Sequence, residues 1–423
     1  MDISSRIKTQ LPHELIDLMQ LAGREAAHAN RRLYLVGGVV RDLLLNRPTF
    51  DVDLAVEGDA TALARKVAAA YKAKLTVHAA FNTAKMQWGE WSIDFATARS
   101  ETYSRPGALP SVKTASIEMD LFRRDFTINA MAVELTGDRW GQLIDLYGGV
   151  SDLDNRIIRI LHDNSFTDDA TRMWRAVRYE QRLGFRLERG TRALLVRDLD
   201  MLDTISGDRI RHELELVLKE EFPEKALRRA GELRILQKTH PSLKADAWLA
   251  RKFRHARRAP GEVALTLQYL GLLVYRLGGD VAQQIADYLK LPRATSQILT
   301  DIMALKPRLA ELSQPRLKPS DTYRLLEDVS PSAVATCQIA SDSPIARRRL
   351  ALYLSTLRHT KPSLAGNDLI TLGLPQGPRV KEVLSALKSA KLDGQVRTRD
   401  DEVEMAKRLI WPALNPGAEP AHQ

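Results

Sequence analysis

The feature that most limits the possible fold is a change of hydrophobic pattern at Gly148-Gly149. Before this dipeptide, short apolar or alternating runs are mixed with helical stretches. After it, long helical patterns punctuated by prolines continue along the chain. Alternation with period 2 places one face of a strand in a core, and a period of 3.6 does the same for a helix. The sequence therefore predicts an α/β N-terminal head, with a sheet and flanking helices, followed by an elongated all-α region.

The chain is long enough to need several domains, because 423 residues exceed what one hydrophobic core organises. No repeat of fixed period and no low-complexity tract interrupts it. We predict a head over residues 1–145, a helical neck over 146–215, a helical body over 216–310 and a helical tail over 311–423.

Composition limits the cellular locations in which such a chain is expected. Charged residues make up 27% of the sequence and apolar residues 44%, and no apolar run approaches the roughly 20 residues that a membrane helix needs. The single cysteine, Cys337, excludes an intrachain disulfide and a zinc site built from several cysteines. Because the first residues also lack a signal-peptide pattern, we expect a cytoplasmic protein with no membrane partner.

The chain is basic, with a formal net charge of +10. A surplus of this kind indicates a polyanionic partner, of which nucleic acid is the commonest, although a basic surface with no special partner explains the charge equally well. The densest cluster is RKFRHARR at residues 251–258. An ordinary solvated helix face would carry the same residues, so this cluster only supports the nucleic-acid interpretation.

Local patterns predict the elements of the head. Residues 1–30 read as one amphipathic helix, because leucines recur near helical spacing. We expect strands at residues 33–36, 50–56, 75–77, 85–88 and 91–96, and a helix at 60–72. Residues 101–118, which contain two prolines and a glycine, are predicted to be a loop beside the functional site.

The first chemical motif is GGVVRD at residues 37–42. A strand that ends in Gly37-Gly38 leaves backbone N–H groups without side-chain cover, and a helix that begins just afterwards directs its positive end to the same place. Arg41 lies one turn into that helix, where its planar guanidinium can meet phosphate oxygens. The arrangement suits a triphosphate. Asp42 is expected to be a structural partner of an arginine or of a helix end.

The second motif is DVDLAV, which places Asp51 and Asp53 two residues apart on a strand. Such positions point to the same face with Cα atoms roughly 6–7 Å apart, so both carboxylates can bind one ion or a pair of ions. Oxygen ligands select Mg²⁺, which assists phosphoryl transfer. A lone D-x-D is mostly a surface pair, but here it follows a Gly-Gly turn and an arginine. Asp94 is the candidate third carboxylate, with an ordinary strand-end aspartate as the alternative.

The third motif is DDATRMWR at residues 168–175, in which Asp169 and Arg172 are three apart on a predicted helix and hence neighbours on its surface. An aspartate accepts from an exocyclic amine, and an arginine donates to a ring nitrogen or carbonyl. Cytosine and adenine offer this pattern on their Watson–Crick edge, whereas uracil and guanine present the reverse polarity. The pair therefore predicts a choice of CTP and ATP, with an i,i+3 surface salt bridge as the alternative.

These motifs resemble the nucleotidyltransferase superfamily that includes DNA polymerase β. Within it, RRDFTINA at residues 123–130, DLYGG at 145–149 and the third motif are similar, in this order, to the class II tRNA nucleotidyltransferases (CCA-adding enzymes) and the bacterial poly(A) polymerases. The sequence departs from the family pattern at Asp168, where the family usually has glutamate. Asp168 lies beside Asp169 and Arg172, the pair predicted to read the base. The resemblance implies a polymerase β-like sheet, Mg²⁺ as cofactor, and a tRNA held by its 3′ end and its acceptor and T arms.

The resemblance also implies further nucleotide-binding residues. Arg175 and Arg178 would carry nucleotide contacts, and their helical positions turn away from the base-reading pair, so we expect them to reach the triphosphate or neighbouring structure. Arg124 is expected to contact a phosphate or the sugar. Asp125 and Asn129 would orient that segment.

The predicted activity is template-independent addition of C and A, from CTP and ATP, to the 3′ end of tRNA with release of pyrophosphate. The alternatives are a bacterial poly(A) polymerase and a partial enzyme that adds only CC or only the final A. The presence of the loop at residues 101–118 argues against a CC-only enzyme, since the family uses such a loop in changing from C to A. An inert RNA-binding protein built on the same head is a further alternative, against which the retention of Asp51 and Asp53 speaks.

Overall fold

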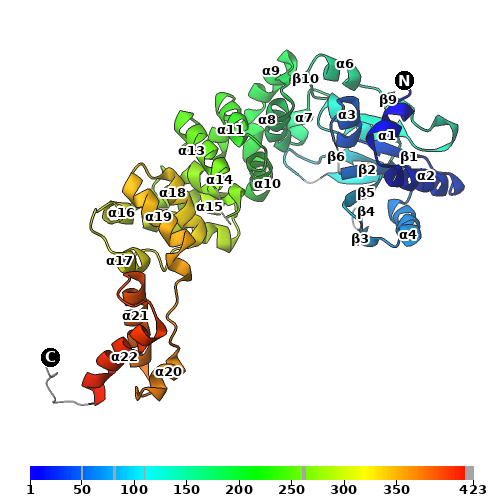
Figure 1. Cartoon of the computed structure of the whole chain (residues 1–423). Coiled ribbons are helices and arrows are strands. Elements are labelled where there is room, and N and C mark those ends of the chain that lie inside the picture. The colour runs from blue at the N-terminus through cyan, green and yellow to red at the C-terminus, as the bar shows by residue number, and fades with distance from the viewer. Residues whose placement is uncertain (49–50, 80–81, 109, 260–262, 415–423) are drawn as a thin grey trace. The chain divides into compact units, whose positions relative to one another are not determined.

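The computed structural model describes residues 1–48, 51–79, 82–108, 110–259 and 263–414. Contacts between residues divide the chain into two compact units, which we call unit 1 (Met1–Pro241) and unit 2 (Ser242–Gln423). Unit 1 contains a mixed sheet with flanking helices, and the described part of unit 2 is helical (Figure 1). The predicted fold class, an α/β head followed by a helix-rich region, is confirmed. The four-part division of the chain stays a prediction.

A seven-stranded sheet lies at the centre of the described part of unit 1, in the order β3-β4-β5-β2-β1-β8-β9. β2 and β5 run parallel, and the other neighbours run antiparallel. The strands are β1 (Leu33–Val36), β2 (Asp51–Val56), β3 (Lys74–His78), β4 (Thr83–Trp88), β5 (Trp91–Thr97), β8 (Met131–Glu134) and β9 (Leu143–Asp145). Each strand predicted from the sequence corresponds to a strand of this sheet. Phe50, at the predicted start of the second, lies outside the described residues.

One face of the sheet carries the acidic residues of β2. Ala55 of this strand belongs to a buried cluster with Ile117 and Leu121 of α5 (Ile117–Phe122). Asp53 and Asp51 precede Ala55 at intervals of two, and side chains alternate along a strand, so both carboxylates project from the face that α5 covers. The sheet therefore orients the D-x-D motif before any ligand is bound.

Helices flank this sheet. α2 (His13–His28) and α4 (Ala60–Tyr71) pack against each other and against the sheet, with α4 over β3, β4 and β5 (Figure 1). The start of α4 is capped by Asp59, whose side chain accepts hydrogen bonds from the backbone N–H groups of Thr61 and Ala62. The helix predicted at residues 60–72 is thereby confirmed.

The N-terminal helix predicted over residues 1–30 is wrong, because two helices, α1 (Ser4–Gln10) and α2, occupy this stretch. Between them Leu11 and Pro12 have extended backbones, with ψ of 148° and 147°. Proline lacks a backbone donor and disfavours the helical conformation of the residue before it, so the helix ends there. Leu11 and Leu15 are both buried, which is why the leucine spacing continues across the break.

The segment at residues 101–118 contains more regular structure than the loop predicted for it. β6 (Arg99–Thr102) and β7 (Ser111–Thr114) pair antiparallel in a separate hairpin, and α5 begins at Ile117. Residue 109 lies outside the described residues. The prolines and the glycine fall in the connection between the two strands, so they mark the end of a hairpin. β8 and β9, of four and three residues, were not predicted from the sequence.

Further α-helices and short strands belong to unit 1. They are α3 (Gly38–Leu44), α6 (Gly149–Asp154), β10 (Ile157–Ile158), α7 (Ser165–Asp168), α8 (Thr171–Leu183), β11 (Arg186–Leu187), α9 (Arg189–Arg197), α10 (Gly207–Leu218), α11 (Pro223–Glu232) and α12 (Ile235–Thr239). α8 packs against α10 and α11, and its Trp174 is fully buried. This packing fixes the orientation of the polar side chains that α8 and α10 present to the functional site.

Unit 2 contains α13 (Ala247–Arg258), α14 (Leu265–Val274), α15 (Gly279–Tyr288), α16 (Arg293–Glu311), α17 (Pro319–Arg324), α18 (Pro331–Ala340), α19 (Pro344–Ser355), α20 (Gly366–Thr371), α21 (Pro378–Leu392) and α22 (Arg399–Leu414). α18 packs against α14, α16 and α19, and Cys337 on it is buried. Proline occupies the start of α17, α18, α19 and α21, where its fixed φ suits a helix and its missing N–H costs no hydrogen bond.

Candidate active site

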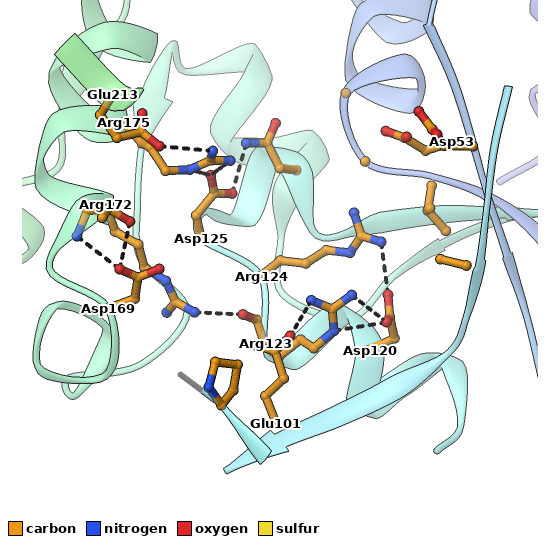
Figure 2. Close-up of a pocket in the computed structure, with 18 of the residues that line it drawn as sticks. Asp53, Glu101, Asp120, Arg123, Arg124, Asp125, Asp169, Arg172, Arg175 and Glu213 are labelled. Carbon is orange, nitrogen blue, oxygen red and sulfur yellow. Dashed lines mark hydrogen bonds and ion pairs between the residues drawn. The ribbon is translucent and has the colours of Figure 1, made fainter. Parts of the chain in front are cut away.

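A cavity of about 990 Å³ lies in unit 1, over the sheet face that carries Asp53 (Figure 2). β1, β2, β5, α8 and α10 all contribute to its lining. The predicted site residues that line it are Gly37, Gly38, Arg41, Asp53, Asp94, Arg124, Asp125, Asn129, Asp169, Arg172 and Arg175. Asp51 and Arg178, which the structure also describes, do not line it. The fold thus brings together residues from motifs that are far apart in the sequence.

Asp53 and Asp94 are direct neighbours in register on the parallel strands β2 and β5. Burial raises the pKa of the Asp53 carboxyl, and the negative charges of Asp94 and Asp51 raise it further, against the opposing charge of Arg124. A divalent cation would relieve this repulsion, and carboxylate oxygens are the ligands that Mg²⁺ prefers. The donor set at this edge of the cavity therefore fits a metal ion.

The metal role of Asp94 stays a prediction. Its Oδ2 accepts a hydrogen bond from Nζ of Lys85 at 3.3 Å, and both side chains are partly exposed. In the part of the chain that the structure describes, no group of three or more His, Cys, Asp or Glu side chains is close enough together to hold a metal ion as it stands. Asp94 lies in the middle of β5, so it is not the strand-end aspartate of the alternative interpretation.

Gly37 makes room for Arg124 beside the acidic residues. Its backbone, with φ 76° and ψ −132°, has a conformation that is nearly confined to glycine. A Cβ there would lie 2.7 Å from Nη1 of Arg124 and 3.6 Å from Oδ2 of Asp53. Nη2 of Arg124 donates to Asp120, while its Nε is buried without a hydrogen-bond partner among the described residues. Nη1, the guanidinium nitrogen that lies beside this uncovered glycine, is placed to meet a phosphate oxygen.

Arg41 is buried and is held by two neighbours. Its Nη1 donates to Oδ1 of Asn129 at 2.7 Å, and its Nε and Nη2 donate to the two carboxylate oxygens of Asp42 at 2.9 and 2.8 Å. Asp42 is therefore the structural partner of an arginine, as predicted. α3 begins at Gly38, directly after the turn, which also matches the prediction. A phosphate contact from Arg41 stays a prediction.

Asp125 is a buried carboxylate with a strong cationic partner. Its Oδ2 accepts from Nε and Nη2 of Arg175 at 2.8 and 2.6 Å, and its Oδ1 accepts from Nδ2 of Asn129 at 3.0 Å (Figure 2). Burial alone would raise the pKa of Asp125, but the charge of Arg175 and the hydrogen bond from Asn129 lower it to about 2. Asp125 is therefore ionised at neutral pH and ties the RRDFTINA segment (residues 123–130) to α8.

Two acidic residues that the sequence did not single out organise the neighbouring arginines. Oδ1 of Asp120 accepts from Nη2 of Arg123 at 2.8 Å, and its Oδ2 accepts from Nη2 of Arg124 at 2.9 Å (Figure 2). Although burial raises it, these arginines hold the pKa of Asp120 below its usual value. Glu101 in β6 accepts from Nη1 of Arg123 at 2.9 Å. The i,i+3 and i,i+4 spacing of Asp120 to the arginines was a signal in the sequence, whereas the contact of Glu101 was not.

Asp169 does not lie on the helix that carries Arg172, so the prediction that they are neighbours on one helix is wrong. The backbone of Asp169 is extended, with φ −145° and ψ 98°, and α8 begins only at Thr171. Oδ1 of Asp169 accepts from the backbone N and from Oγ1 of Thr171, at 3.0 and 2.6 Å. Aspartate side chains compete for free backbone N–H groups at a helix start, and this contact keeps the residue outside the helix.

The alternative of a surface salt bridge is also wrong. Arg172 is buried, and its guanidinium donates from Nη1 to Oγ of Ser165 at 2.7 Å and to its carbonyl at 3.4 Å, and from Nη2 to the carbonyl of Arg123 at 2.7 Å. Asp169 pairs instead with Nη2 of Arg209 at 2.9 Å. Because a guanidinium has five N–H donors, Arg172 retains donors for a ligand in the cavity. Base reading by this pair stays a prediction.

Arg178 reaches neighbouring structure. Its Nη2 lies 3.9 Å from Oε2 of Glu213 in α10, and its guanidinium stands 4.9 Å from the ring centre of Tyr179. Glu213 also lies 3.7 Å from Nη1 of Arg175. Burial raises the pKa of Glu213 against these two arginine charges. Glu213, Tyr179 and Arg209 all line the cavity, yet none was predicted, because they lie outside the motifs and no local spacing connects them to it.

In unit 2 the basic segment at residues 251–258 lies on α13, with Arg254 and His255 exposed. A second cavity, of about 460 Å³, is lined by His255 together with Arg347 and Arg348 of α19. We call these three residues, together with Arg254, which is exposed next to His255 but does not line the cavity, the basic groove. None of the described residues that line this cavity is acidic or is Phe, Tyr or Trp. The groove therefore suits phosphate groups better than stacked bases.

Comparison with known families matches most of unit 1. Residues 33–159 match the family described as "Poly A polymerase head domain", and residues 184–246 match the one described as "Probable RNA and SrmB- binding site of polymerase A". The first match contains the D-x-D motif and the RRDFTINA segment. The second ends directly before α13 begins at Ala247.

Several relatives match along nearly all of the chain. The A-adding tRNA nucleotidyltransferase of Geobacter sulfurreducens is 35% identical over 94% of this chain, which spans only 47% of that relative's length. The A-adding tRNA nucleotidyltransferase of Halalkalibacterium halodurans is 31% identical over 95% of this chain and 94% of its own. A CCA-adding enzyme of Geobacillus sp. is 31% identical over 92% of this chain and 94% of its own.

Solved structures agree with these relatives. The Thermotoga maritima CCA-adding enzyme complexed with tRNA has a TM-score of 0.75 and 31% identity over 98% of this chain and 99% of its own. Structures of CCA-adding enzyme with ATP and with CTP each have a TM-score of 0.78, at 30% and 31% identity, over 98% of this chain and 99% of theirs.

The mixed sheet, the cavity above it and these similarities define an enzyme of the nucleotidyltransferase class. The chain belongs to the family of class II tRNA nucleotidyltransferases and bacterial poly(A) polymerases. The resemblance predicted from the sequence motifs is thereby confirmed. As for membranes, no helix among the described residues combines the length and apolar character needed to cross a bilayer.

Proposed function

We propose that the protein adds C and A, from CTP and ATP, to the 3′ end of tRNA in a Mg²⁺-dependent reaction. The 3′ hydroxyl oxygen of the RNA forms a bond to the α-phosphorus and gives up its proton to solvent. The bond from the α-phosphorus to the bridging oxygen breaks, and pyrophosphate leaves with the electrons of that bond. The observation that carries this proposal is that Asp53 and Asp94, the arginines of three separate motifs, and Asp169 all line one cavity of unit 1.

Asp51, Asp53 and Asp94 are the residues that would hold the metal. Bound Mg²⁺ supplies a lower pKa for the attacking hydroxyl and neutralises charge on the leaving phosphates. Burial and, to a smaller extent, the negative charges of Asp94 and Asp51 raise the pKa of Asp53, and this supports the assignment, because an added cation would offset that repulsion. Lys85, which pairs with Asp94, would have to exchange its partner if Asp94 takes part.

The triphosphate would bind at Gly37 and Gly38. The position of Nη1 of Arg124 beside Gly37 supports a phosphate contact there, and the absence of a side chain on Gly37 permits a close approach. Arg41, held by Asp42, contributes positive charge beneath this turn. Asp125 and Asn129 keep the segment in place, and Arg175 adds charge from α8.

Nucleotide choice would depend on Asp169 and Arg172. Both line the cavity from the start of α8, and Arg172 retains donors that the protein does not use. A carboxylate acceptor beside a guanidinium donor is complementary to the amine and ring nitrogen of cytosine and adenine. One pair therefore serves both nucleotides without a template.

An RNA partner is supported by the net charge of +10 and by the basic groove. The match of residues 184–246 to an RNA-binding region and the tRNA complex of the Thermotoga enzyme point the same way. Phosphate contacts of this kind need no specific sequence, so the groove would bind the backbone of folded RNA.

A second candidate is addition of the final A only. It is favoured by the names of the Geobacter and Halalkalibacterium relatives, both of which are A-adding enzymes. Poly(A) tailing of other RNA is a third possibility, since the head family takes its name from that activity. An inert RNA-binding protein is disfavoured by the retained acidic residues.

One experiment separates these possibilities. The full-length protein is incubated with Mg²⁺, labelled CTP or ATP, and one of three RNAs: tRNA without CCA, tRNA lacking only the final A, or an unrelated RNA. We expect extension by CCA on the first and by A on the second. Extension of the second alone identifies an A-adding enzyme, and long tails on unrelated RNA identify a poly(A) polymerase.

The matched control is Asp53→Ala. We expect it to abolish incorporation and to leave the dissociation constant for tRNA within a few-fold of the wild type. Undiminished incorporation by this variant would refute the metal assignment.

A further inference from the structure

The carboxylate of Asp169 is held through one oxygen. Oδ1 accepts from the backbone N and Oγ1 of Thr171 and from Nη2 of Arg209, at 3.0, 2.6 and 2.9 Å. Oδ2 accepts no hydrogen bond from the residues that the structure describes. Because Asp169 lines the cavity, Oδ2 is the oxygen that remains to accept from an amine on a bound base.

Arg209 reaches Asp169 from a different helix, α10, and contacts a third segment as well. Its Nη1 lies 3.5 Å from the carbonyl oxygen of Gly107, in the connection between β6 and β7. Gly107 has φ 74°, and a Cβ there would lie 2.3 Å from the carbonyl oxygen of Thr204. The connection therefore packs closely against the backbone that precedes α10, and only glycine permits this approach.

We propose that Arg209 is a positioning residue for nucleotide choice. It holds Oδ1 of Asp169 so that Oδ2 faces the amine of the incoming base, and the connection at Gly107 holds Arg209 in turn. A carboxylate that rotates freely would accept from water or from a wrongly oriented base, and the discrimination carried by its oriented contact would be lost. This inference rests on the proposed function and adds to it the residue that sets the geometry of base reading.

The test measures kcat/KM for CTP on tRNA without CCA and for ATP on tRNA lacking only the final A, each against UTP and GTP, with the full-length protein. Replacement of Arg209 by glutamine should lower the ratio of correct to incorrect nucleotides roughly ten- to hundred-fold, which is the value of one oriented base contact. Arg209→Lys keeps the positive charge but lacks the planar guanidinium. Its ratio of correct to incorrect nucleotides should therefore lie between those of the wild type and Arg209→Gln.

Gly107→Ala should lower the same ratio, because its Cβ cannot fit against Thr204. In the double variant with Arg209→Gln the two effects should not add, since both act through the same carboxylate. The matched control is Arg228→Gln, an exposed arginine of α11 whose nearest carboxylate, on Glu232, lies 3.9 Å away. It should leave the ratio unchanged.

The outcomes are distinct. If Arg209→Gln lowers kcat/KM equally for all four nucleotides, and Arg209→Lys does not raise the ratio of correct to incorrect nucleotides, the role of Arg209 is purely structural and the inference is overturned. An unchanged ratio would overturn it as well. Absence of incorporation by the wild-type protein would instead refute the proposed function. Thermal unfolding of each variant identifies any that do not fold, and Arg209→Lys, as the smallest change, then decides between the outcomes.

Discussion

Replacement of Gly37 by alanine tests whether the turn after β1 matters through its contact with Arg124. The backbone of Gly37, with φ 76° and ψ −132°, is strained for any other residue, which costs about 1–3 kcal/mol of folding free energy. The new Cβ would lie 2.7 Å from Nη1 of Arg124, so the guanidinium must move. Because the end of a long side chain shifts easily, this movement costs little stability. It does remove the guanidinium from its place beside Asp53.

The effect on catalysis should exceed the effect on stability. A hydrogen bond to a charged group contributes about 1.5–3 kcal/mol. If the moved Arg124 loses one such contact to the triphosphate, kcat/KM should fall roughly ten- to hundred-fold, since about 1.4 kcal/mol corresponds to a factor of ten.

Gly184→Ala provides the comparison, because Gly184 has φ 70° and nothing lies within 4 Å of the position that a Cβ would take there. An alanine at this position costs about 1–2 kcal/mol through its backbone alone. Thermal unfolding should register both variants, at about 2–4 °C for each kcal/mol in a unit of this size. Steady-state kinetics should register Gly37→Ala alone. Equal losses of kcat/KM in the two variants would refute the argument from Arg124.

Three further predictions concern base choice, stability and RNA binding. Asp169→Ala should relax the preference for CTP and ATP over UTP and GTP, and an unrelaxed preference in competition assays would refute base reading by this residue. Asp125→Asn should destabilise unit 1 by at least about 2 kcal/mol at pH 7, since the pKa of about 2 lies well below the ordinary 3.8 and Arg175 would lose its partner. The lowered pKa of Asp125 stabilises the folded wild type above about pH 4, and this contribution is lost as the pH falls toward 2. The difference in free energy of unfolding between variant and wild type, measured in denaturant titrations, should therefore shrink over that range. Arg254→Glu combined with Arg347→Glu should weaken tRNA binding, and the deficit should shrink roughly tenfold from 50 to 200 mM salt if each residue makes one phosphate contact; a deficit that does not change with salt would argue against such contacts.

Local patterns predicted the strands well and the ends of helices poorly. Apolar runs and alternation are both properties of adjacent residues, so β1 at Leu33–Val36 and β5 from Trp91 could be located from the sequence. The break at Pro12 was missed because the leucines on both sides are buried in one core, and their spacing hides the interruption. The β6–β7 hairpin was missed because β7 contributes no side chains to a hydrophobic core: its residues 111–114 are all exposed.

The active-site predictions divide in the same way. The shared face of Asp51 and Asp53 followed from their spacing, and a structural role for Asp42 was predicted, although not that Arg41 would be its partner. Contacts across the fold did not, because Glu101 reaches Arg123 from 22 residues away and Arg209 reaches Asp169 from 40 residues away. No local pattern encodes such pairs.

The D-x-D strand, the Gly-Gly turn and the order of the motifs were enough for the sequence alone to determine the family and to predict the chemistry. They did so because strand alternation and turn geometry follow from neighbouring residues. Only the tertiary structure decided that Asp169 stands outside α8 and that Arg209, not Arg172, is its partner. The physical reason is that the orientation of one carboxylate depends on competing donors, here a helix start and a guanidinium from α10, which are brought together by packing and not by the sequence near Asp169.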